Sequence, residues 1–150
     1  MRDIAQNRKA RYNYHILETF EAGIVLQGTE VKSCRLNNVS MHDSYARARG
    51  GELWLTGVHI AEYVQGNRNN HEPRRARKLL LHKREIQRLS QAVDAKGQTL
   101  VPLRFYFNKR NKIKVEIGLC KGKQEHDKRD TMRKKEHENE ARRAIKQHRG

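Results

Sequence analysis

The chain has 150 residues and a formal net charge of +16, with 33 lysines and arginines against 17 aspartates and glutamates. This length fits one domain with an appendage, and no apolar run approaches the roughly 20 residues of a membrane-spanning helix. The first residues lack the apolar core of a signal peptide, so we expect a cytoplasmic protein in which Cys34 and Cys120 stay thiols. A chain this basic attracts polyanions, and nucleic acid is the partner that its charge predicts.

The N-terminal dozen residues read as a basic arm that leads into a first strand, Tyr14–Phe20, ending at Glu21-Ala22-Gly23. This stretch is rich in β-branched and aromatic residues, as strands are. After another short extended run, Thr29 is expected to cap a helix over Glu30–Arg35. The cations of the arm are Arg2, Arg8, Lys9 and Arg11.

Two further strands, Ser44–Arg49 and Glu52–Ile60, flank Gly50-Gly51, and two glycines between extended runs predict a tight hairpin turn. Gly66–Arg77 has no periodicity and predicts a mobile basic loop. Phosphate contact fits its charge, although such a run is a weak motif. The apolar block Leu79–Leu81 then predicts a buried strand.

The strongest helical pattern covers His82–Ala95, where Ile86, Leu89 and Val93 form one apolar stripe and Gly97 can end the helix in a left-handed conformation. This helix is expected to stand between the strands that precede it and a closing hairpin.

The last hairpin pairs Thr99–Phe107 with Lys112–Leu119, and apolar residues alternate with polar ones along both strands. On its first strand Phe105 and Phe107 are expected in the core, whereas Tyr106 lies on the basic face. Strands dominate and the βαβ alternation of open sheets is missing. The pattern therefore predicts a mainly β fold: a small oligonucleotide-binding-type barrel with flanking helices and a basic C-terminal tail.

After Leu119 the apolar alternation never resumes, which divides the chain into a body, residues 1–123, and a tail, residues 124–150. Few apolar side chains are available to anchor the tail. Like-charge pairs four residues apart, such as Glu136 with Glu140, weaken an isolated helix. We expect the tail to be disordered when free and to become a helix when it meets RNA.

Catalytic chemistry finds little support in the residue pattern. The eight histidines are scattered without the paired spacing of a zinc site, and no phosphate-binding loop is present. No cofactor is predicted, and we expect the chain not to be an enzyme. Interleaved basic and aromatic residues favour RNA instead, because cations neutralise phosphates and exposed rings stack on bases.

Several motifs, in one order and spacing, closely resemble the SsrA-binding protein (SmpB) family of bacteria. The resemblance covers the chain from about Asn7 to its end and is specific because the motifs occur together. They are Asn7–Arg11, Phe20–Gly23, Gly28–Ser33, Asp43–Arg47, Arg77–His82 and Gly118–Arg129.

The resemblance implies an oligonucleotide-binding-type barrel that binds the tRNA-like part of transfer-messenger RNA (tmRNA) and delivers it to stalled ribosomes in trans-translation. It also implies a tail that enters the decoding centre and the empty mRNA channel as a helix. Elongation factor Tu and alanyl-tRNA synthetase become possible partners through the RNA.

The resemblance also implies roles for individual residues. The tmRNA contacts are expected at Glu21, Leu81 and His82, with the arm residues Asn7, Arg8, Lys9 and Arg11. The contacts in the decoding centre are expected at Lys121, Lys123, His126, Asp127, Lys128 and Arg129, and an apolar pair, Ala144 and Ile145, is expected to support accommodation.

Two rival functions remain open at this point. A ribosomal protein or general single-strand binder on the same barrel would lack any preference for a tRNA-like fold. A nuclease or RNA-modifying enzyme would show turnover, which the scattered carboxylates and histidines do not favour.

Overall fold

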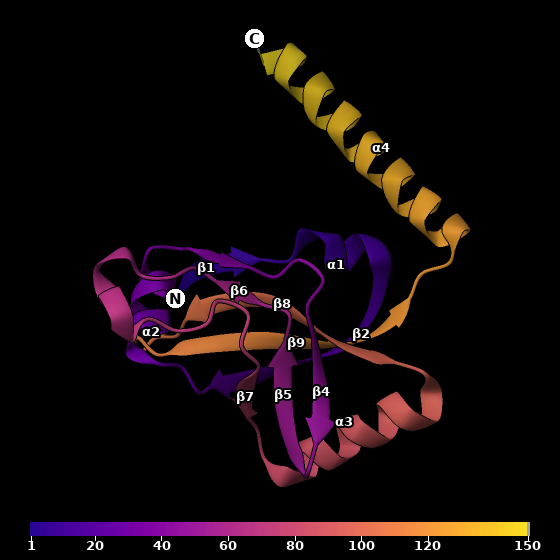
Figure 1. The fold of residues 1–150 in the computed structure, drawn as a ribbon. Helices are drawn as coiled ribbons and strands as arrows, with labels where there is room; N and C mark the ends of the chain where they lie inside the picture. The colour runs from indigo at the N-terminus through magenta and orange to yellow at the C-terminus, as the bar shows by residue number, and fades with distance from the viewer. Residues whose placement is uncertain (150) are drawn as a thin grey trace.

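A computed structural model describes residues 1–149, except for the side chains at positions 67, 68, 96, 125, 127 and 144–149. Within this part, a 7-stranded antiparallel sheet has the order β1-β8-β4-β5-β7-β2-β9, and β3 pairs separately with β6 (Figure 1). The strands are β1 (Arg2–Gln6), β2 (Tyr14–Ile24), β3 (Val39–Ser40), β4 (Tyr45–Arg49), β5 (Glu52–Thr56), β6 (His59–Ile60), β7 (Arg77–Leu80), β8 (Thr99–Phe107) and β9 (Ile113–Gly122).

The sheet curls until it nearly closes into a ring, because β8 pairs with β4 as well as with β9. The β8–β9 ladder is long, whereas β4 reaches β8 through the pair Ala46 and Leu100. The helices are α1 (Arg8–Asn13), α2 (Gly28–Arg35), α3 (Lys83–Lys96), α4 (Glu125–Arg149) and the 3-10 turn η1 (Val64–Asn69). The fold is therefore mixed α/β, and the prediction of a mainly β fold understated its helices.

The second predicted hairpin and the helix before it are confirmed, and the first hairpin is confirmed at its turn. Its second strand, predicted as Glu52–Ile60, instead breaks at Gly57, where φ is 87°, into β5 and the separate β6 that pairs with β3. Gly50 and Gly51 have φ of 60° and 76°, so the β4–β5 turn uses the left-handed region that glycine enters without strain. In α3 the predicted stripe faces the core, with Leu89 fully buried, and Gly97 ends the helix at φ 62°. Along β8 and β9, Phe105, Val115 and other alternating residues fill the inside of the ring.

The N-terminal arm is more ordered than predicted. Residues 2–6 form β1 against the far end of β8, and Asn7 caps α1 by accepting a hydrogen bond from the Ala10 amide at 3.3 Å. The following strand, β2, also continues through Gly23 instead of ending there. A side chain at Gly23 would put its Cβ 3.2 Å from the Cβ of Leu80, so glycine allows β2 to pair closely with β7.

Helix α2 begins earlier than predicted, and its cap differs. Its first residue is Gly28, and Gln27 precedes it at the cap position that was predicted for Thr29. The Glu30 carboxylate reaches back to accept a hydrogen bond from the Gln27 amide at 2.8 Å, which satisfies a free amide at the helix start.

The prediction of a mobile basic loop over 66–77 is wrong at its C-terminal end, where Arg77 is 0% exposed. Its Nε donates to Glu30 Oε2 at 2.5 Å, and its other nitrogens donate to the carbonyls of Val58 and Pro73 at 2.7 and 2.9 Å. Arg75 donates to the other Glu30 oxygen at 2.5 Å. These two cations therefore hold the loop to α2.

Both cysteines are buried free thiols. Burial, reinforced by the negative charge of Glu30, raises the pKa of Cys34 to about 12. Burial alone raises the pKa of Cys120 to about 11. Neither thiol forms a reactive thiolate at neutral pH.

Helix α4 projects away from the body in Figure 1. Its 25 residues make it about 37 Å long at 1.5 Å per residue. No helix within residues 1–149 combines the length and the apolar character needed to cross a membrane.

Candidate RNA-binding interface

A shallow groove on the outer surface of β2, β7 and β9 brings together the main residues that the sequence predicted for RNA contact. We call it the Glu21 groove, and its volume is about 340 Å³. Its lining residues are Glu21, Gly23, Leu80, Leu81, His82, Glu85 and Lys114.

Glu21 is exposed, and the Tyr106 hydroxyl on β8 donates a hydrogen bond to its Oε2. Tyr106 itself is only 3% exposed. Burial raises the pKa of Tyr106 far above its usual value, and the hydrogen bond to Glu21 raises it further, so the phenol stays protonated and keeps donating. This fixes the carboxylate, and its other oxygen can accept a hydrogen bond from the edge of a base.

Two carboxylates near Glu21, those of Asp3 and Glu116, are neutralised by one arginine. Arg104 pairs with Asp3 at 2.9 Å and with Glu116 at 3.3 Å, and its guanidinium lies 4.3 Å from the centre of the Tyr106 ring. Glu116 lies opposite Glu21 in the β2–β9 register. The hydrogen-bond donor that holds Glu21 is a neutral hydroxyl and not a cation, so the carboxylate is available to a ligand.

A second groove, which we call the Arg11 groove, is lined by Glu116, the residue opposite Glu21 in the β2–β9 register. It has a volume of about 310 Å³, and Arg8, Arg11 and Arg104 contribute its cations. The predicted arm residues thus divide into three situations. Arg8 and Arg11 line this groove, Lys9 lines a different hollow beside residues 41–44, and Asn7 lines both hollows while its side chain bonds to the chain itself. The Asn7 amide group donates to the Pro102 carbonyl at 2.9 Å, which is a structural role.

The structure separates the two leucines at the end of β7. Leu81 is half-buried and packs against the core, whereas Leu80 is 51% exposed in the Glu21 groove. His82 is exposed at the start of α3. Leu81 and not Leu80 was predicted to contact RNA, although alternation from the buried Leu79 places Leu80 on the outside.

The root of the tail is attached to α1. The Lys123 ammonium donates to the Arg11 carbonyl at 3.0 Å and to the Thr131 hydroxyl at 2.7 Å. The Lys128 ammonium lies 5.9 Å from the centre of the Tyr12 ring. These contacts place the start of α4 beside the Arg11 groove.

The other residues predicted to contact the decoding centre either are exposed or have side chains that the structure does not describe. Lys121, His126 and Arg129 are exposed. The side chains of Asp127, Ala144 and Ile145 lie outside the described residues. Leu80 and Lys114 also line the Glu21 groove, and neither was among the residues predicted to contact RNA.

The family model for SmpB protein matches residues 4–147. The SsrA-binding protein of Carboxydothermus hydrogenoformans is 57% identical over 143 residues, which cover 95% of each chain. The SsrA-binding protein of Afipia carboxidovorans is 52% identical over 143 residues, covering 95% of this chain and 91% of its own.

A solved structure gives the same result at the level of the fold. It is described as "tmRNA-SmpB: a journey to the center of the bacterial ribosome", and one of its chains aligns with a TM-score of 0.68 at 51% identity. The alignment covers 86% of this chain and 94% of that one. This chain therefore belongs to the SmpB family of SsrA-binding proteins.

Proposed function

We propose that the body binds the tRNA-like part of tmRNA through the Glu21 and Arg11 grooves, and that the tail secures acceptance of this RNA by a stalled ribosome. Family membership makes the chain a tmRNA-binding protein of trans-translation and not an enzyme. The observation that carries the assignment of the grooves is the Glu21 carboxylate, held in place by Tyr106 on a strongly basic protein.

A fixed carboxylate distinguishes this interface from a surface that binds phosphates alone. Arg8, Arg11 and Lys114 supply positive charge for the RNA backbone. Glu21 would repel phosphate, but it accepts hydrogen bonds from amino and imino groups on base edges. Leu80 adds an exposed apolar contact beside it. Such a combination suits unpaired loop bases in a structured RNA.

The other parts of the proposal concern the barrel, the tail and the partners. The nearly closed sheet acts as a barrel of the oligonucleotide-binding type, and the protein works in the cytoplasm, where its ribosomes are. Lys121, Lys123, His126, Asp127, Lys128 and Arg129 lead the tail into the decoding centre, and Ala144 and Ile145 support the accommodated helix. Elongation factor Tu and alanyl-tRNA synthetase meet the protein through the bound RNA.

Charge reversal at Glu21 tests the proposed groove. Glu21→Lys should reduce the preference for the tRNA-like part of tmRNA over random RNA by roughly 10- to 100-fold, because hydrogen bonds to a charged group contribute about 1.5–3 kcal/mol. The matched control is Glu62→Lys, which makes the same charge change at an exposed residue outside both grooves. Competition binding at fixed salt measures both. Equal preference in the two variants would remove Glu21 from the interface.

The free state of the tail gives a second prediction. In α4 the tail is helical, but its like-charge pairs and scarce apolar residues should leave it mostly unfolded on its own. Circular dichroism of a peptide spanning residues 124–150 should therefore show little helix in buffer and more in the presence of ribosomal RNA. A fully helical free peptide would mean that the tail reaches the ribosome preformed.

A further inference from the structure

The outer face of β4, β5 and β7 carries a row of side chains that the Glu21 and Arg11 grooves do not use. Trp54 on β5 lies opposite Arg47 on β4 and opposite Lys78 on β7 in the two antiparallel registers. The ring is thus flanked by a cation on each side. The residues before and after it, Leu53 and Leu55, are fully buried, so Trp54 lies on the outside of the ring.

This surface is basic and hollowed. We call it the Trp54 face, and its residues are Tyr45, Arg47, Arg49, Trp54 and Lys78. A hollow of about 580 Å³ lies over its β4–β5 part. Glu52 is the one acid that lines this hollow, and it forms an ion pair with Lys78 at 3.0 Å. Among the described residues, neither Arg47 nor Arg49 has an ion-pair partner, so both remain available to an anion.

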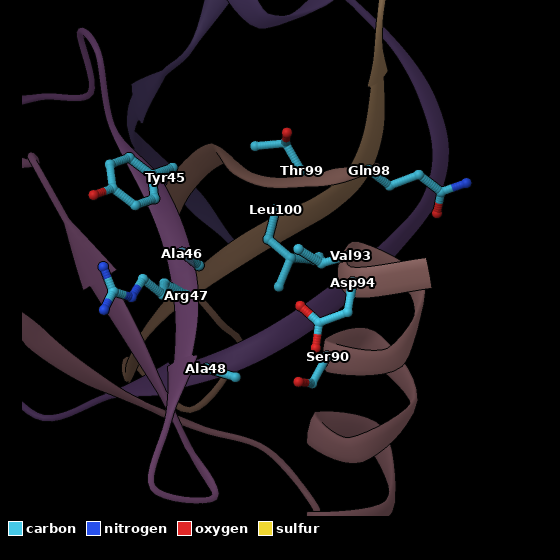
Figure 2. Close-up of a pocket in the computed structure, with 10 residues that line it drawn as sticks. All are labelled: Tyr45, Ala46, Arg47, Ala48, Ser90, Val93, Asp94, Gln98, Thr99 and Leu100. Carbon is cyan, nitrogen blue, oxygen red and sulfur yellow. The ribbon is translucent and has the colours of Figure 1, made fainter. Parts of the chain in front are cut away.

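A neighbouring groove, between β4 and α3, sets the border of this face. Its volume is about 360 Å³, and it is lined from α3 by Ser90, Val93 and Asp94. Figure 2 shows Asp94 on the α3 side of this groove. The ring of Tyr45 and the guanidinium of Arg47 point away from Asp94. The exposed Asp94 carboxylate repels a phosphate chain from that groove. Arg47 lines both hollows, whereas Arg49 lines the hollow over Trp54 and not this groove.

We propose that the Trp54 face binds an unpaired RNA strand, with one base stacked on Trp54 and the adjoining phosphates held by Arg47 and Arg49. Aromatic rings between cations provide sequence-tolerant binding of single strands, because every base has a flat face and every nucleotide a phosphate. The inference goes beyond recognition of the tRNA-like part. Lys78 and Leu80, a residue of the Glu21 groove, lie two residues apart on β7. An RNA strand on the Trp54 face would therefore continue from RNA bound in the Glu21 groove.

Trp54 is the only tryptophan of the chain, so its fluorescence reports directly on this face. An unstructured oligouridylate of about eight nucleotides is a suitable probe, since single-strand sites of this kind span roughly 4–16 nucleotides. Titrating the full-length protein should quench Trp54 and reach saturation. Binding of a labelled probe without any change in Trp54 fluorescence, or no binding at all, would overturn the proposal.

Variants then separate stacking from general attraction. Trp54→Ala should lower the affinity for the probe by roughly 5- to 150-fold, the range for loss of one stacked base. Trp54→Phe should keep most of the affinity, because its ring can still stack on a base. Thermal unfolding of each variant checks that a loss of affinity does not come from a folding defect. Arg47→Gln should make the slope of log affinity against log salt shallower by about 0.7. Arg110→Gln, on the β8–β9 turn, is the charge-matched control and should change this slope less than Arg47→Gln does.

The two RNA sites can fail independently in these experiments. Glu21→Lys should leave quenching of Trp54 by the oligouridylate in place, whereas Trp54→Ala should leave the preference for the tRNA-like part in place. Wild-type affinity of the Trp54→Ala variant for the probe would overturn the Trp54 face. Loss of probe binding in Glu21→Lys would overturn it as well, because the probe would then occupy the Glu21 groove.

Discussion

Removing residues 124–150 should leave the affinity for tmRNA nearly unchanged and abolish peptide tagging on stalled ribosomes. The Glu21 and Arg11 grooves lie wholly in the body. The tail holds nine lysines and arginines against six acids, so most of the net charge also stays with the body. The tail, in turn, is a long helix attached near α1 and otherwise projects from the body, as an element that reaches into a separate site would (Figure 1).

The measurement is a pair of assays on the same truncated protein: tmRNA binding in solution and tagging of a stalled chain in a reconstituted translation system. A full-length variant with residues 124–150 in scrambled order is the matched control, because it keeps the charge and length of the tail. It should also fail in tagging. If the truncation loses tmRNA binding, or if the scrambled tail supports tagging, the division between body and tail is wrong.

Glu30→Gln should lower the free energy of unfolding by about 3–5 kcal/mol, the cost of leaving a buried charge without its partner. Glu30 and Arg77 are both fully buried and lie 2.5 Å apart at their nearest atoms. A neutral amide offers one acceptor oxygen in place of two, and it cannot balance the charge of the guanidinium. Urea unfolding of the two proteins measures the difference.

The control for this prediction is the double variant Glu30→Met/Arg77→Met, which removes both charges. It should be more stable than Glu30→Gln, because apolar residues of similar volume often replace a buried ion pair without loss. Arg75, the other partner of Glu30, is partly exposed and can turn to water. If Glu30→Gln unfolds like the wild type, the ion pair does not hold the 66–77 segment.

The same pair predicts a pH dependence. Burial alone would raise the pKa of Glu30, but hydrogen bonds from Arg75, the Gln27 amide and Arg77 outweigh it and lower the pKa below 4.5. A lowered folded-state pKa contributes stability above the unfolded-state value, and this is lost as the pH falls through the folded-state value. The penalty of Glu30→Gln should therefore be full at pH 7 and shrink below about pH 4.5. A penalty that is constant with pH would contradict this origin.

The elements that sequence reasoning predicted are those with a local signal. The β4–β5 hairpin follows from Gly50-Gly51, and α3 follows from an apolar stripe with a glycine at its end. The N-terminal β1 has no such signal, because its stability comes from pairing with β8, about a hundred residues away. Arg77 was misjudged for the same reason: a buried arginine looks like any loop cation until its partner, Glu30, is placed beside it.

The candidate site shows a similar division. Glu21 and His82 were named through family resemblance, and the fold brings both to one groove. Tyr106 could be assigned to a face by alternation, but its bond to Glu21 joins β8 to β2 around the ring and depends on tertiary structure. Leu80 was within reach of the alternation rule, which distinguishes it from Leu81.

The most direct test of specific tmRNA binding is competition of tmRNA against equimolar tRNA and random RNA across a salt series. We expect a preference for tmRNA that persists at salt concentrations where random RNA no longer binds, because base contacts at Glu21 do not depend on counterion release. Equal affinities that fall together, by about 0.7 to 0.9 log units per neutralised phosphate for each decade of salt, would contradict it. The protein would then be a general basic RNA binder.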